Sequence, residues 1–167
     1  MEPFHEYMHE YKKQLQKGAI TKAYKGLMGY ILGLRTHFQN KYPGYFVSGI
    51  YSGYMDMTCF SFHPKSIKDR KLKIVIVFLH QAFRFEIWLA GYNKQVQTKY
   101  WKLLEENRWD KYRLVPSMKG VDSILESTLV DDPDFKDLDA LTGQIEQATL
   151  KFIKDVDDFL SEHDNRL

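Results

Sequence analysis

The chain has 167 residues and a mass of 19.8 kDa, the usual size of one domain and enough to bury a core without disulfides or metals. Hydrophobic residues make up 44% and charged residues 28%, which excludes a disordered chain. The single cysteine, Cys59, excludes an internal disulfide and a multi-cysteine zinc site. There is no long apolar stretch and no basic, apolar leader, so we expect a cytoplasmic protein with no membrane partner.

The formal net charge of +2 hides an uneven distribution. Residues 1–130 hold 20 basic and 11 acidic side chains, whereas residues 131–167 hold 4 basic and 11 acidic ones. Opposite charges of this size attract, so we expect the acidic segment to lie against basic groups of the preceding chain. The densest basic run, which would suit a nucleic acid, comprises Lys65, Lys68, Arg70, Lys71 and Lys73.

Two helices are predicted at the N-terminus, over residues 3–16 and 20–40. Pro3 suits the first turn of a helix, and Gly18 is a typical stop signal. Apolar residues recur every three or four positions in both segments, which is the helical period. In the first helix they are Phe4, Tyr7, Met8, Tyr11 and Leu15.

Strands are predicted next, over residues 45–52, 54–62, 72–79 and 84–90, with a tight turn at Gly53. The segment 72–79 is apolar on both faces, so it should be central in the sheet. The remaining predicted elements are a helix over 94–107 capped by Asn93, a strand over 112–115, a helix over 121–129 and a last helix over 138–161. This order predicts a single α+β domain spanning residues 1–167, with an antiparallel sheet of about five strands and the N- and C-terminal helices packed on it.

The segment His5-Glu6-Tyr7-Met8-His9 matches the H-E-x-x-H string of zinc proteases. On a helix the two histidines lie on the same side, and the glutamate could activate a zinc-bound water. Such helices normally lie inside a domain, whereas this one opens the sequence. We therefore expect no bound metal or other cofactor, and keep His5 and His9 only as alternative zinc ligands.

A nuclease-like magnesium site would need carboxylates that converge from neighbouring strands. Asp56 followed by Asp69-Arg70-Lys71 has the required order, but the second group precedes its strand instead of lying in it. This alternative depends on the fold bringing Asp56 and Asp69 together.

The strand 84–90 carries the residues that we favour as a binding site. Phe85, Ile87 and Leu89 form one apolar face, and Arg84, Glu86 and Trp88 form the other. If Gln81-Ala82 is a two-residue turn, Leu79 lies opposite Arg84, Val77 opposite Glu86 and Val75 opposite Trp88. A charged pair among apolar neighbours needs a partner, so we predict that Arg84 and Glu86 pair with each other or with Asp56, and that Trp88 borders a cavity.

Part of the sequence also resembles a known group of proteins. The run from Phe78 to Gly91, then Asn93 and Gln97, and then Asp131-Asp132-Pro133-Asp134-Phe135 is similar to a bacterial family of uncharacterised proteins, a domain of unknown function. The resemblance covers nearly the whole chain. It implies a cytosolic, single-domain bacterial protein and transfers no catalytic residue.

These observations favour a small non-catalytic binding or interaction protein with a protein partner or a small ligand, its site formed by Arg84, Glu86, Trp88 and Asp56. One alternative is a metal-dependent hydrolase or nuclease-like enzyme. A second alternative is a nucleic-acid-binding accessory protein that uses the basic run at 65–73.

Overall fold

The computed structural model describes residues 3–116 and 122–164. The helices and strands of these residues follow one another as α1 (Phe4–Lys17), α2 (Ala19–Lys41), β1 (Phe46–Val47), β2 (Met57–His63), α3 (Lys65–Asp69), β3 (Leu72–Leu79), β4 (Arg84–Gly91), α4 (Lys94–Glu106), β5 (Arg113–Leu114), β6 (Leu125–Asp131) and α5 (Leu138–His163).

Internal contacts divide the chain into two compact units, residues 1–37 and 38–167. The first unit contains α1 and most of α2. Gly18 ends α1 in the left-handed conformation (φ 82°), which glycine adopts without strain, and none of the α1 residues is buried. No described helix is both long and apolar enough to cross a membrane. The single-domain organisation stays a prediction.

The second unit is built on a six-stranded antiparallel sheet in the order β1-β2-β3-β4-β6-β5. The predicted α+β class is confirmed, with one strand more than expected. The predicted central strand is also confirmed, because β3 pairs with β4 along its whole length and with β2 over residues 75–79, and is buried on both faces. The hairpin around Gly53 has a first strand reduced to β1 and one isolated bridge between Tyr51 and Cys59.

The predicted register of the β3–β4 hairpin is confirmed. Leu79 lies opposite Arg84, Val77 opposite Glu86 and Val75 opposite Trp88. The turn is wider than predicted, since a hydrogen bond from the Phe83 N–H to the Leu79 carbonyl closes a four-residue loop. Gln-Ala lacks the positive φ angles that a two-residue hairpin turn requires, and Phe83 supplies one instead, with φ 54°.

The predicted helix over 121–129 is wrong where the structure describes it. Residues 125–131 form strand β6, which pairs with β4 on one side and with β5 on the other. Thr128 and Val130 are β-branched and favour extended backbone, and burial of Leu125 against β4 adds the tertiary contribution that a local pattern does not contain. Residue 121 lies outside the described residues.

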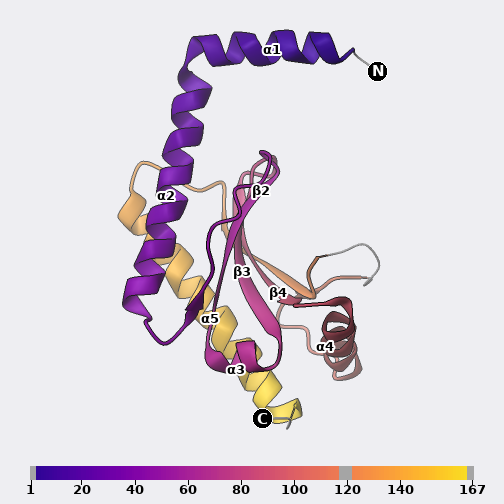
Figure 1. Cartoon of the computed structure of the whole chain (residues 1–167). Coiled ribbons are helices and arrows are strands. Elements are labelled where there is room, and N and C mark those ends of the chain that lie inside the picture. The colour runs from indigo at the N-terminus through magenta and orange to yellow at the C-terminus, as the bar shows by residue number, and fades with distance from the viewer. Residues whose placement is uncertain (1–2, 117–121, 165–167) are drawn as a thin grey trace. The chain divides into compact units, whose positions relative to one another are not determined.

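One face of the sheet carries the core of this unit. Phe60, Ile76 and Ile87 are at most 2% exposed, and Phe38 at the end of α2 packs against Phe60 and Phe62. The helix α5 runs along one side of the sheet (Figure 1) and buries an apolar stripe. That stripe includes Leu141, Ile145, Phe152, Ile153, Val156, Phe159 and Leu160. The opposite sheet face, which bears Arg84, Glu86 and Trp88, is more polar.

Candidate functional site

Arg84, Glu86 and Trp88 form one hydrogen-bonded group on the polar face of β4. Glu86 accepts from the Arg84 Nε at 2.5 Å and from the Trp88 Nε1 at 2.8 Å. Its side chain is 6% exposed, whereas that of Arg84 is 39% exposed. The Glu86 carboxylate raises the pKa of the Arg84 guanidinium by hydrogen bonding and by its charge. The predicted Arg84–Glu86 pair is therefore present, and its acidic member is held by two donors.

A pocket of about 320 Å³ opens beside this group, at the β6 side of the sheet. Its lining residues come from β4, from β5 and the segment leading into it, and from β6. They are Arg84, Glu86, Lys111, Tyr112, Arg113, Glu126, Ser127 and Thr128. Trp88, which we predicted to border a cavity, does not line this pocket, but it donates to Glu86 and lies opposite Glu126, which both line it.

Two local features shape the pocket. The β4–β6 pairing shifts register between Phe85 and Glu86, so that Phe85 lies opposite Val130 and Glu86 opposite Thr128. Such bulges re-aim side chains, and this one sets Thr128 directly across from Glu86. The short strand β5 pairs only with the first two residues of β6, which leaves Ser127 and Thr128 to line the pocket beyond it.

The cations of the pocket are more accessible than its carboxylates. The side chains of Arg84, Lys111 and Arg113 are 39%, 60% and 66% exposed. Glu86 is 6% exposed and Glu126 is 25% exposed, and Glu126 is held by Arg113 at 3.2 Å and by the Ser123 hydroxyl at 2.7 Å. A ligand that enters the pocket therefore meets cationic groups more readily than acidic ones.

Tyr112 joins the pocket to α5. Its hydroxyl donates to Asp155 at 2.7 Å, and burial followed by this hydrogen bond raises the pKa of Tyr112. Asp155 also accepts from Lys151 and lies 3.7 Å from Lys111, so its pKa is lowered. These contacts fix the segment that forms one wall of the pocket.

Asp56, the fourth predicted site residue, lies elsewhere. One oxygen of its side chain accepts from the Tyr54 N–H at 2.8 Å, and its backbone carbonyl accepts from the His80 N–H at 3.0 Å. Hydrogen bonds from the Tyr54 and Met57 backbone lower the pKa of this carboxyl. Asp56 thus stabilises the turn after Gly53 and pairs with neither Arg84 nor Glu86.

The residues of the two metal hypotheses are also dispersed. His5 and His9 are exposed on α1. Asp69 ends α3 and pairs with Lys65, beyond the far end of β2 from Asp56. Among residues 3–116 and 122–164, no three His, Cys, Asp or Glu side chains are grouped so that they could hold a metal ion.

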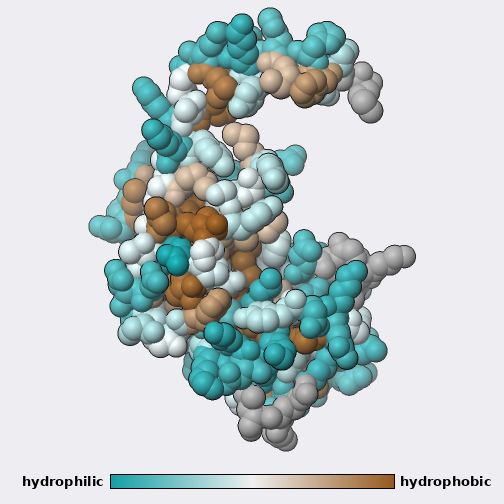
Figure 2. All heavy atoms as spheres, in the orientation of Figure 1, coloured by the Kyte–Doolittle hydropathy of each residue, from teal (hydrophilic) through white to brown (hydrophobic). Residues whose placement is uncertain are grey.

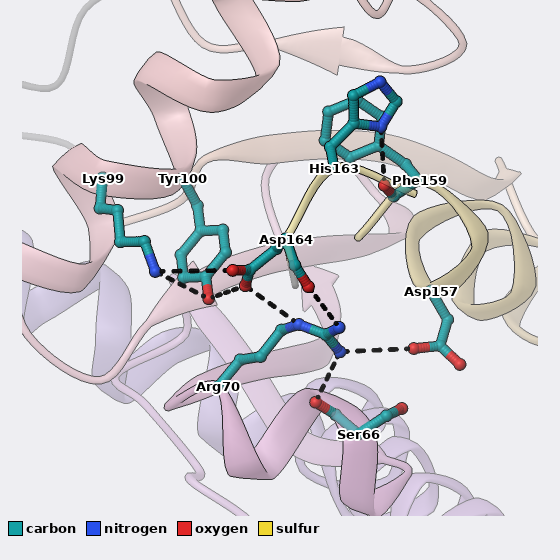
Figure 3. Close-up of polar contacts among 8 residues, drawn as sticks. All are labelled: Ser66, Arg70, Lys99, Tyr100, Asp157, Phe159, His163 and Asp164. Atoms are coloured by element: carbon teal, nitrogen blue, oxygen red, sulfur yellow. Dashed lines mark hydrogen bonds and ion pairs between the residues drawn. The ribbon is translucent and has the colours of Figure 1, made fainter. Parts of the chain in front are cut away.

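A second polar cluster joins α3, α4 and the end of α5 (Figure 3). Asp164 accepts from the Tyr100 hydroxyl at 2.6 Å and from the Arg70 Nε at 3.2 Å, and the side chains of Arg70 and Asp164 are both 5% exposed. Arg70 also donates to the Ser66 carbonyl at 3.0 Å, and Asp157 lies 3.9 Å away. The geometry is that of a clamp that ties α3, α4 and α5 together.

The same cluster changes how the basic run at 65–73 is interpreted. Arg70 is buried and engaged by Asp164, and Lys65 is paired with Asp69. The predicted attraction between the acidic segment and the basic groups is confirmed by Arg70–Asp164 and by Lys41–Glu146 at 2.7 Å. Part of the run thus neutralises the chain's own acidic residues.

Sequence reasoning missed most of the pocket wall. Glu126, Ser127 and Thr128 were assigned to a helix, which hid their position beside β4. The β-branched residues Thr128 and Val130 were the available signal for a strand. No sequence signal connects Lys111 with β4, since only the pairing of β5 with β6 brings them together.

Glu86→Gln is expected to lower the free energy of unfolding by about 1–3 kcal/mol. A neutral amide accepts less strongly from Arg84 and Trp88, and its NH₂ group faces donors. Urea unfolding of the variant measures this loss. Asp158→Asn is the matched control, because Asp158 is 57% exposed and a solvent-exposed pair such as that with Lys154 contributes little to stability. An equal loss in both variants would contradict a special role for Glu86.

The fold and the pocket define a small α+β protein with a polar cavity at the side of an antiparallel sheet. Residues 4–160 match the family model described as Domain of unknown function (DUF7000), and the chain belongs to this family. No curated protein and no solved structure matches it.

Proposed function

We propose that the chain is a non-catalytic binding protein of the cytoplasm, and that the pocket between β4, β5 and β6 takes a small ligand bearing a carboxylate or phosphate group. The exposure of the pocket's cations, set against the burial of its carboxylates, carries this proposal. Arginine side chains suit such a ligand because their planar donors match carboxylate and phosphate oxygens. Glu86 would hold Arg84 in position without itself touching the ligand.

The state of the pocket carboxylates favours binding over catalysis. A general base must present an accessible oxygen within reach of the proton that it removes. Glu86 is engaged by Arg84 and Trp88, and Glu126 by Arg113 and Ser123. None of the lining residues is a histidine or a cysteine.

Thermal unfolding in inorganic phosphate or citrate tests the proposal. The melting temperature should rise above that in sodium chloride of equal ionic strength, because a ligand at 100 times its Kd adds about 2.7 kcal/mol of stability. The double variant Lys111→Gln/Arg113→Gln should lose this increment. The control Lys154→Gln removes an exposed lysine outside the pocket and should keep it. If all three proteins respond alike, the anion acts nonspecifically and the pocket is not its site.

Two other results would favour the alternative functions. Stoichiometric zinc in protein purified without a histidine tag, lost in His9→Ala, would favour a metal-dependent hydrolase. Salt-sensitive retention on heparin that weakens in Lys68→Gln/Lys71→Gln would favour a nucleic-acid-binding protein.

A further inference from the structure

The helix α1 exposes a complete apolar stripe. Its side chains follow the helical period and are 40–77% exposed, and Figure 2 shows brown and tan residues gathered along one side of this helix with teal residues on the other. The stripe consists of Phe4, Tyr7, Met8, Tyr11 and Leu15. Full burial of a large apolar side chain is worth about 1.5–3 kcal/mol, so covering the stripe would contribute substantial binding energy.

The charge of α1 and the following region is positive on balance, because Lys12, Lys13 and Lys17 of α1 stand against Glu6 and Glu10 and the chain after them adds only cations up to residue 55. From residue 11 to residue 55 the sequence contains seven basic side chains and no aspartate or glutamate. Five of these seven are lysines on α1 and the first turns of α2, and all five are exposed: Lys12, Lys13, Lys17, Lys22 and Lys25. An occupant of the stripe should therefore be anionic.

A second copy of α1 meets this requirement poorly. The stripe spans only about two heptads, which is short for a stable coiled coil. His5 and Lys12 flank it on one side, and Tyr7 and Gln14 stand at the outer positions of the other side. In an antiparallel pair each flank meets the same flank of the other copy, so Lys12 would meet Lys12 or His5, and no opposite charge would steer the pairing.

We propose that α1 binds the surface of a membrane rich in anionic phospholipid, with its axis in the plane of the interface. The aromatic rings of Phe4, Tyr7 and Tyr11 would enter the boundary between headgroups and acyl chains, while the lysines contact lipid phosphates. The expectation of no membrane partner rested on the lack of a spanning stretch. A helix that lies on the surface does not need one.

Co-sedimentation of the full chain with vesicles tests this proposal. Vesicles of 70% phosphatidylcholine and 30% phosphatidylserine should bind the chain, and pure phosphatidylcholine vesicles should bind it at least tenfold more weakly. Raising sodium chloride from 0.1 to 0.5 M should weaken binding to the mixed vesicles, because salt screens the lysine contacts.

Two variants separate the apolar and the charged contributions. Tyr7→Ser/Tyr11→Ser and Lys12→Gln/Lys13→Gln/Lys17→Gln should each bind the mixed vesicles at least tenfold more weakly. None of these residues is buried, so the substitutions leave the cores intact. The matched control for the tyrosines is Tyr54→Ser, since Tyr54 is 89% exposed but lies outside α1. It should bind like the original chain.

The proposal is overturned if the chain ignores both vesicle types, if it binds them equally, or if either α1 variant binds unchanged. Analytical ultracentrifugation adds one further outcome. Self-association that disappears in Tyr7→Ser/Tyr11→Ser, without vesicle binding, would assign the stripe to a second copy of the chain instead.

Discussion

Asp164→Asn is expected to lower the free energy of unfolding by about 3–5 kcal/mol. The substitution removes the negative charge of the carboxylate that pairs with the buried Arg70 guanidinium. A buried charge that has lost its partner destabilises the fold by more than the intact pair stabilises it. It also weakens the acceptor of the Tyr100 hydroxyl, 2.6 Å away. Equilibrium unfolding in urea measures the loss.

A double-mutant cycle distinguishes this pairing from general disruption. Arg70→Met and Asp164→Leu should each be strongly destabilising, whereas the two together should cost much less than their sum, because neither buried member of the pair is then left without the other. Tyr100→Phe removes a single hydrogen bond and should cost only about 1 kcal/mol. Additive losses in the cycle would contradict the clamp.

Lowering the pH from 7 to 5 is expected to remove about 2 kcal/mol of stability through His63 alone. Burial lowers the pKa of this imidazole from 6.5 to about 4, and Lys68 and Lys73 add like-charge repulsion. The unfolded chain therefore binds the proton more readily than the folded one between pH 6.5 and 4, so stability falls as the pH drops through this window.

The geometry around His63 explains why the ring resists a second proton. Its Nδ1 accepts from the Ile74 N–H at 3.2 Å, so the neutral ring carries its hydrogen on Nε2, which is buried without a partner among the described residues. Urea unfolding at pH 7, 6 and 5 should show a steeper decline for the original chain than for His63→Gln. Parallel declines would mean that His63 does not control the acid response.

The parts of the fold that the sequence predicted correctly are those with local patterns. The alternation of apolar and polar residues in β4 indicated which side chains face the core. A slip of one residue would have exposed Phe85, Ile87 and Leu89, so only one register of the β3–β4 hairpin kept them buried. The pairing of Arg84 with Glu86 followed in turn from their position on one face. Strand β6 was missed because its extended state depends on pairing with β4, which no window of the sequence contains.

The contacts and site residues that the sequence did not predict depend on residues far apart in the chain. Arg70 and Asp164 are 94 positions apart, so the sequence indicated only a general attraction between a basic region and an acidic segment. Lys111 and Arg113 reach the pocket through a strand of two residues, too short for a reliable alternation. Asp56 was grouped with Arg84 on chemical grounds, but its side chain satisfies the backbone of its own turn.

The hydrogen bond from Trp88 to Glu86 connects the pocket to an intrinsic fluorophore, the Trp88 indole. The indole N–H donates to one oxygen of Glu86, while the other oxygen holds Arg84, which lines the pocket. A ligand that draws Arg84 toward itself would change the field at this indole. The other two tryptophans have different surroundings, since Trp101 donates to the Val115 carbonyl and Trp109 lies against Phe159 and against Tyr112, which also lines the pocket. Occupancy of the pocket should therefore change tryptophan emission without an attached dye, and Trp88→Phe would show how much of the change comes from the indole that is bonded to Glu86.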